Sequence, residues 1–230
     1  GNELLLLTAT GSAVNELTLA NASTGNGPIL SATGETNVDI NLNPKGTGVL
    51  KSGAVAVKKA GLETMWVPSS AMYGSTTNGA DAQQVETTAL KPDMKVLDFD
   101  AGTNEFSQFS VAFPKSWNEG TITYQVFWTP SNTNTGNCLF GLQGISIADG
   151  DPIDAAFDAA VLITDAGIGT VEDQQVSPVS SAVTVKSAAV DTQTYFQFSR
   201  DATAGADTFT GDARVLGIKI FFTTDAANDA

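Results

Sequence analysis

The chain has 230 residues and a formal net charge of −14, with 25 acidic and 11 basic side chains. A surface this acidic repels phosphate backbones, so the charge argues against nucleic-acid binding. Histidine is absent and Cys138 is the sole cysteine, which excludes an intrachain disulfide and the usual Ser-His-Asp catalysis, and removes the commonest transition-metal ligand. Hydrophobic residues make up 42% of the chain and charged residues 16%, a balance typical of a protein with a packed core.

Residues 1–57 contain no aromatic side chain and are rich in Thr, Asn, Gly, Ala and Leu. Short β-prone pieces at 17–20, 38–42 and 49–51 alternate with turns at 25–28 and 43–46. Each piece is too short and too rich in glycine to build a monomeric core. We therefore expect a slender, intertwined, β-rich shaft in which several copies assemble. A flexible linker is the alternative, against which stands the regular alternation of Val38, Ile40 and Leu42.

Residues 58–94 are predicted to form a junction between this shaft and the rest of the chain. Within it, residues 63–67 have the composition of a strand, and Pro68 suits the end of one. Residues 73–86 are polar and rich in turn formers, so we expect a long exposed loop there.

Residues 95–230 are predicted to form an antiparallel, jelly-roll-like β-sandwich, which makes the whole chain all-β. Apolar residues alternate with small or polar ones at 109–113 and 122–128, on either side of a turn at 114–120. In the last expected strand, alternation places Leu216, Ile218, Ile220 and Phe222 inward, with Val215, Lys219 and Phe221 outward. A single short helix is expected at 152–159, with Asp151 as its N-cap. The further strands are expected at 139–147, 160–164, 181–186, 194–200 and 213–223.

Several of these segments resemble those of tailed-bacteriophage virion proteins. Residues 26–34 (NGPILSATG) and 37–48 (NVDINLNPKGTG) resemble a module common in the shafts of tail fibres, tail spikes and head fibres. Residues 95–100 (KVLDFD), 113–120 (FPKSWNEG) and 214–230 look like the C-terminal domain of virion proteins of marine-type phages. The resemblance implies a homotrimer on the particle exterior, whose tip meets host surface polysaccharide or packs on other virion proteins.

Asp149, Asp151 and Asp154 form the strongest carboxylate cluster in the sequence. Such an array offers oxygen ligands to Ca²⁺, although it lacks the full spacing of an EF-hand loop. A solvated loop followed by a helix with an acidic first turn explains the same residues. A glycosidase also needs two carboxyl groups, but their separation cannot be derived from sequence. We therefore expect no enzymatic activity and no cofactor, with Ca²⁺ as the alternative.

Exposed aromatic rings bind sugars because their flat apolar faces stack on C–H groups. Trp117, with Asn118 beside it in the turn at 114–120, and Tyr73 in the junction are the predicted glycan contacts. The alternative for each ring is local packing over the edge of the sandwich.

Together these observations predict a non-enzymatic virion fibre or spike that attaches to host glycans. A capsid decoration, cement or head-fibre protein that stabilises the particle is the alternative, and a polysaccharide depolymerase is the third hypothesis. The chain is short for a depolymerase and lacks the regular coil repeat of a β-helix. No apolar run is long enough to span a membrane, so no membrane insertion is expected.

Overall fold

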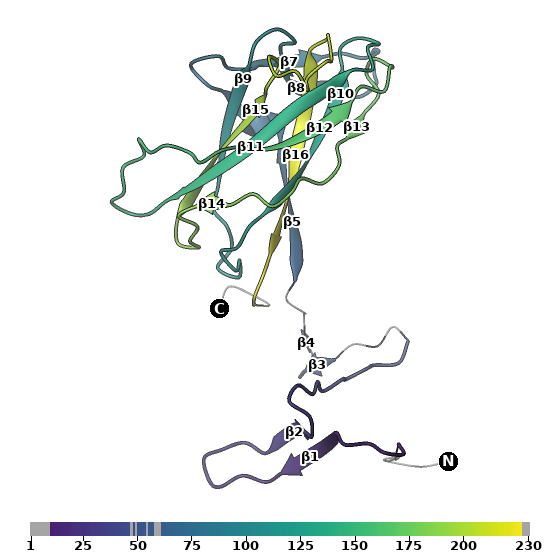
Figure 1. Cartoon of the computed structure of the whole chain (residues 1–230), viewed down its shortest axis with the longest axis vertical. Coiled ribbons are helices and arrows are strands. Elements are labelled where there is room, and N and C mark those ends of the chain that lie inside the picture. Colours follow the sequence, from purple (N-terminus) through teal and green to yellow (C-terminus); the bar gives the residue numbers. More distant parts are fainter. Residues whose placement is uncertain (1–9, 47, 49, 54, 58–60, 227–230) are drawn as a thin grey trace. The chain divides into compact units, whose positions relative to one another are not determined.

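The computed structural model describes residues 10–46, 48, 50–53, 55–57 and 61–226 of the chain. The chain divides into two compact units, Gly1–Val57 and Lys58–Ala230. Among the described residues the regular structure is β-strand, with one short 3₁₀ turn, η1 (Ser69–Ala71). The prediction of an all-β chain with an antiparallel sandwich is confirmed (Figure 1).

The N-terminal unit is built on an antiparallel hairpin of β1 (Glu16–Ala20) and β2 (Ile29–Thr33). A second, smaller pair joins β3 (Lys51–Ser52) to β4 (Val55–Ala56). The strand expected at 17–20 is present as part of β1, whereas residues 38–42 enter no ladder with any described residue. Residue 49 of the third expected piece lies outside the described residues.

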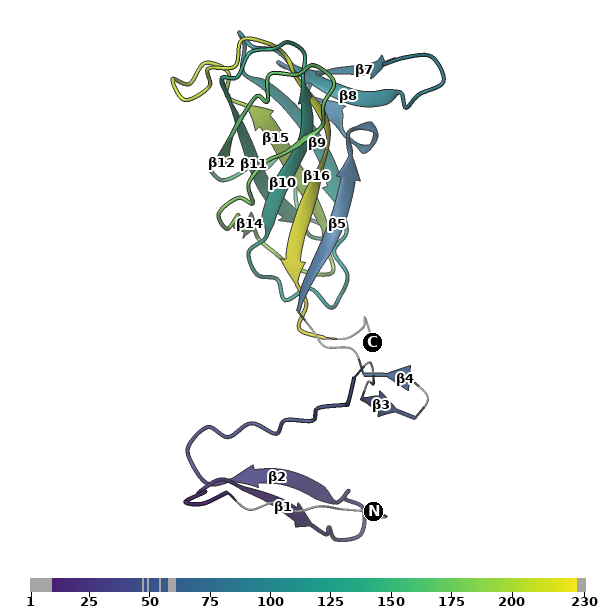
Figure 2. The same ribbon diagram turned by 90° about the vertical axis from the view of Figure 1, so that its right-hand side faces the viewer.

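The C-terminal unit consists of two facing antiparallel sheets, shown from two sides in Figures 1 and 2. The first contains, in spatial order, β13 (Gln175–Val176), β10 (Thr123–Pro130), β16 (Ala213–Thr223), β8 (Met94–Phe99) and β7 (Asp81–Val85), with β5 (Leu62–Pro68) paired to β16. The second contains β12 (Val161–Ala166), β11 (Asn137–Ile147), β15 (Gln193–Arg200), β9 (Glu105–Val111) and β6 (Tyr73–Gly74), with β14 (Val185–Lys186) parallel to β11.

The long strand β16 organises the first sheet because it pairs with three others. Along one side it pairs with β10, and along the other with β8 near its start and β5 near its end. The strand predicted at 63–67 is thus confirmed as β5. The expected loop at 73–86 instead contributes β6 and β7 to the two sheets, since each finds an edge to pair with.

Aromatic side chains fill the space between the sheets. Trp128 of β10 meets Phe140 of β11 edge-on at 5.6 Å, and Phe99 of β8 meets Phe198 of β15 at 5.4 Å. The hydroxyl of Tyr124 donates across the core to the Val161 carbonyl at 2.8 Å, so its polar end is satisfied. Cys138 is fully buried in the same core, where it packs as a small apolar side chain.

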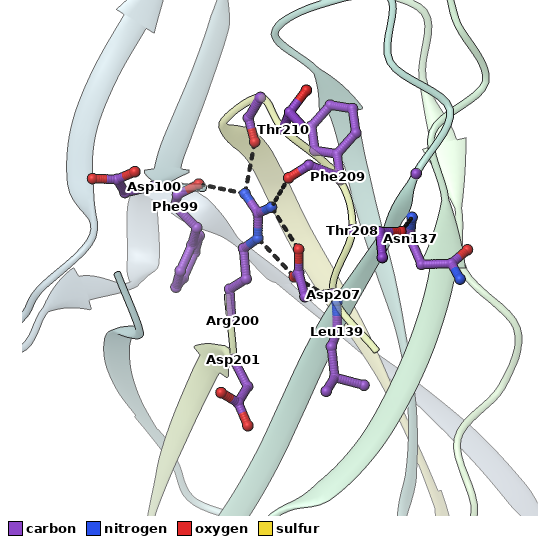
Figure 3. A network of polar contacts seen from close by, with 12 residues as sticks. Phe99, Asp100, Asn137, Leu139, Arg200, Asp201, Asp207, Thr208, Phe209 and Thr210 are labelled. Atoms are coloured by element: carbon purple, nitrogen blue, oxygen red, sulfur yellow. Dashed lines mark hydrogen bonds and ion pairs between the residues drawn. The ribbon is translucent and has the colours of Figure 1, made fainter. Parts of the chain in front are cut away.

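One buried ion pair stands at the end of this core (Figure 3). The guanidinium of Arg200 is fully buried and makes a two-pronged contact with Asp207, each N–O distance being 2.9 Å. Its remaining N–H groups donate to the carbonyls of Phe99, Phe209 and Gly211. Every donor therefore has a partner, and the network ties β8, β15 and the loop before β16 together.

The sides predicted for two residues of the last strand are wrong. Alternation placed Leu216 inward and Val215 outward, but Val215 is buried and Leu216 is half-buried. The register shows why: Phe127 pairs with Gly217 and Trp128 with Val215, so Leu216 is an extra residue in a bulge that reverses the alternation before it.

The helix expected at 152–159 is also absent. That stretch has no regular structure, and Ile153 is 68% exposed. Eight residues give too few hydrogen bonds to hold a helix unless an apolar face packs on the protein, and here Ile153 does not.

Candidate functional site

The predicted glycan contacts do not form one surface. Trp117 is 1% exposed and stacks on Phe113 at 4.1 Å, so its ring faces are occupied and cannot meet a sugar. The turn at 114–120 folds over the end of the sandwich, which is the local packing that was the alternative for this ring. Asn118 is exposed beside Thr223, whereas Tyr73, 53% exposed, lies in β6 of the other sheet.

The predicted calcium ligands are not arranged to bind a metal ion together. Asp149, Asp151 and Asp154 are exposed in the loop after β11, where the Asp151 carboxylate accepts a bond from the Ala148 amide. Across the described residues, no group of three or more His, Cys, Asp or Glu side chains is placed to hold a metal ion. The calcium alternative for this cluster therefore has no support in the geometry.

A different aromatic surface lies on the outer face of the first sheet. Trp66 on β5 is 46% exposed and meets the half-buried ring of Phe127 on β10 edge-on, with 5.0 Å between ring centroids. Between their strands runs β16, where Gly217 faces Phe127 and Lys219 faces Trp66 in register. A β-carbon at Gly217 would come within 2.6 Å of the indole of Trp66, so glycine leaves room for this ring to lie across the sheet.

These rings line an open hollow of about 450 Å³ that we call the Trp66 platform. Its rim carries both charged and neutral polar side chains, and the bulged Leu216 adds an aliphatic surface to the floor. The ammonium group of Lys219 lies 5.1 Å from the centre of the Phe127 ring. The full lining is Trp66, Asp93, Met94, Lys95, Phe127, Gln174, Leu216 and Lys219.

Sequence reasoning missed this surface although a signal was present. Phe127 occupies an outward position in a strand whose other outward residues, Thr123 and Gln125, are polar. An aromatic ring on the solvent side of an alternating strand has no core to fill, and it indicates a candidate binding surface where a second exposed apolar side chain lies beside it. Alternation along the sequence does not predict that Trp66 lies beside Phe127, because the pairing of β5 with β16 places Trp66 on this face of the sheet.

No family model matches the chain, and no curated protein sequence matches it. Solved structures with a similar arrangement of strands include a carbohydrate-binding module of family CBM36 in complex with calcium and xylotriose. Its sequence is 14% identical and its TM-score is 0.37, and the match covers 68% of this chain and 98% of that one. They also include the CBM22-1 and GH10 modules of a Clostridium thermocellum xylanase with xylohexaose. The identity is 12% and the TM-score 0.42, and the match covers 74% of this chain and 29% of the xylanase chain. A third is the structure of infectious bursal disease virus, strain Gt, at 11% identity and a TM-score of 0.36. That match covers 90% of this chain and 41% of the viral chain. Similarity this low concerns the β-sandwich alone, so the function must be argued from the residues.

Over the part of the chain that the structure describes, no helix is long and apolar enough to cross a membrane.

An acidic cluster surrounds a second, polar hollow of about 220 Å³ near β7 and β8. Burial raises the pKa of Asp98, Arg214 at 3.5 Å lowers it, and Asp212 and Asp81 raise it further. Burial likewise raises the pKa of Glu105, although its carboxylate accepts a bond from the Asp100 amide at 2.7 Å. The cluster consists of Asp81, Asp98, Asp100, Glu105 and Asp212, and the amide of Gln83 completes the lining of the hollow.

Glu105→Gln is expected to stabilise the folded protein at pH 7 by less than about 1 kcal/mol, since the site is partly exposed to solvent. Because the pKa of Glu105 is raised in the folded state, its ionised carboxylate destabilises the folded protein at pH values above that pKa. Below the unfolded-state pKa of about 4.3 the carboxyl group is protonated in both states, and this destabilisation disappears. The advantage of the variant should therefore shrink as the pH falls to about 4, as measured by urea unfolding at several pH values.

Glu86→Gln is the matched control, because it removes one carboxylate from an exposed site of the same unit and leaves the cluster intact. A stability difference for Glu105→Gln that stays constant from pH 7 to pH 4 would contradict the assignment of the cost to the ionised carboxylate.

Proposed function

We propose that this chain is a non-catalytic attachment protein on the exterior of a phage particle, with a β-sandwich that binds surface polysaccharide. The Trp66 platform is the proposed binding surface, and the N-terminal unit is the proposed site of homotrimer assembly. The sequence resemblance supports the virion location and the trimer, and the geometry of the platform supports the binding of a glycan.

The observation that carries the glycan proposal is the exposed ring of Trp66, which meets the half-buried ring of Phe127 beside polar side chains. An aromatic ring covers the apolar face of a sugar, while neighbouring amide, carboxylate and ammonium groups bond its hydroxyls. The platform offers all of these: the two rings, the Gln174 amide, the Asp93 carboxylate and the Lys219 ammonium. Its strands belong to the rigid sheet, so little conformational entropy is lost on binding.

Trp66→Ala is expected to weaken binding to polysaccharide extracted from the host surface by about tenfold to a hundredfold, as for the loss of a central aromatic contact. Isothermal titration calorimetry with size-fractionated oligosaccharides provides the measurement. The fluorescence of Trp117 and Trp128, both buried in the core, checks that the variant is folded.

Tyr73→Ala is the matched control, because it removes an exposed aromatic ring from the opposite sheet. If Tyr73→Ala abolishes binding and Trp66→Ala leaves it intact, the binding surface lies at Tyr73 and the platform proposal is wrong.

A capsid decoration or cement role is the second candidate, favoured by the aliphatic floor of Met94 and Leu216, which also suits a protein surface. Particles without the protein should then lose resistance to heat or osmotic shock while still adsorbing to cells. Normal resistance combined with impaired adsorption would favour the glycan-binding role.

A further inference from the structure

Positive charge is concentrated at the Trp66 platform of an otherwise acidic protein. In residues 61–226, Arg200, Arg214 and Lys186 form ion pairs with aspartates of the same unit. The other basic side chains there form no ion pair with a described residue, and two of them line the platform. These four are Lys91, Lys95, Lys115 and Lys219.

The two platform lysines reach the hollow from different strands. Lys219 projects from β16 directly opposite Trp66, and its ammonium lies near the Phe127 ring, which lets it stay beside the aromatic surface. Lys95 projects from β8. An ammonium group in this setting has several donors free for an incoming ligand.

The one carboxylate in the lining is already engaged. The Asp93 carboxylate accepts a bond from the side-chain amide of Gln84 at 2.8 Å. The lining therefore contains two lysines that form no ion pair with a described residue and one carboxylate, so its formal charge is positive although the protein as a whole is at −14. Lysines beside exposed aromatic surface complement a ligand that carries negative charge next to an apolar ring face.

We infer that the Trp66 platform recognises a polysaccharide of negatively charged sugars, with one sugar ring against Trp66 and its anionic group on Lys219 and Lys95. This inference rests on the glycan-binding function proposed above and adds the charge of the ligand. Lysine acts as a point charge and accepts either a carboxylate or a sulfate, so both kinds of sugar fit the chemistry.

The test uses two pairs of polymers that share a backbone and differ in charge. Oligogalacturonate is compared with its methyl ester, and sulfated dextran with dextran, by calorimetry on the full chain. We expect at least one charged member to bind about tenfold more tightly than its neutral partner, as for one added charge-assisted bond. Preference within the first pair indicates a carboxylate ligand, and preference within the second a sulfate.

The variant Lys95→Gln/Lys219→Gln should remove this preference, so that the charged and the neutral member of each pair bind the variant with equal affinity. Lys115→Gln, at an exposed site in the turn at 114–120, removes one charge from the same unit and should keep the preference. If Lys115→Gln weakens the preference as much as the double variant does, net charge and not the platform is responsible, and the inference is wrong.

The remaining outcomes separate this inference from the proposed function. Equal binding of both members of each pair, still lost in Trp66→Ala, would overturn the charge inference and leave glycan binding in place. No binding of any of the four polymers would overturn the charge inference, whereas the glycan-binding function is decided by the host polysaccharide and Trp66→Ala. Dissociation of the oligomer by Trp66→Ala, measured as a smaller sedimentation coefficient, would show that a second copy covers the platform and would overturn both.

Discussion

Replacing Arg200 with methionine is expected to lower the free energy of unfolding of the β-sandwich by about 3–5 kcal/mol, the usual cost of breaking a buried ion pair. The side chain of Asp207 is 1% exposed, so its carboxylate would remain buried without its cation. The carbonyls of Phe99, Phe209 and Gly211 would lose their donor as well. Such a loss is a large part of the total stability of a domain and should lower the melting temperature by roughly 10 °C.

Tryptophan fluorescence during urea unfolding measures this effect cleanly, because Trp66, Trp117 and Trp128 all lie in the sandwich. Arg214→Met is the matched control: its guanidinium lies 3.5 Å from Asp98 at a partly exposed site, so the loss should be about 1 kcal/mol or less.

Arg200→Lys should fall between wild type and Arg200→Met, since one ammonium cannot reproduce the two-pronged contact and the three bonds to carbonyls. Arg200→Met/Asp207→Leu should recover part of the loss by removing the unpaired carboxylate. Equal stability of Arg200→Met and Arg214→Met would refute the structural role assigned to this network.

Leu17→Asp is expected to dissociate the protein into monomers at micromolar concentration. Several large apolar side chains of the N-terminal unit face solvent in a single copy; among them Leu17 is 63% exposed and Leu19 80%. Leu17, Leu30 and Ile40 line an open groove of about 220 Å³ within this unit. A second copy that covers a leucine gains about 1.5–3 kcal/mol per side chain, and in a trimer the aspartate is introduced three times.

Analytical ultracentrifugation of the full chain provides the measurement, with a trimer expected for the wild type. Leu90→Asp is the matched control, because Leu90 is fully exposed in a turn of the other unit and has a φ of 67°, which Asp tolerates well. A wild-type protein that sediments as a monomer would refute the trimer directly, whatever the variants do.

The sequence determined the elements whose residues alternate without interruption. Tyr124 and Val126 belong to the apolar side of the alternation at 122–128, and both point inward from β10. Phe196 and Phe198 share the buried face of β15 in the same way, because period-two alternation places every second residue on one face of a strand. Composition alone likewise excludes whole classes of chemistry, since the chain has no histidine and no second cysteine.

Only the tertiary structure decided where the candidate site lies. Trp117 was expected on the surface because it stands in a polar turn, but that turn closes over the core and buries the ring. The bulge at Leu216 reversed the expected sides of Val215 and Leu216, since one unpaired residue shifts the alternation of the residues before it. The Trp66 platform joins residues about 60 and 150 positions apart through strand pairing, and pairing partners are not encoded in local alternation, which records burial but not neighbours.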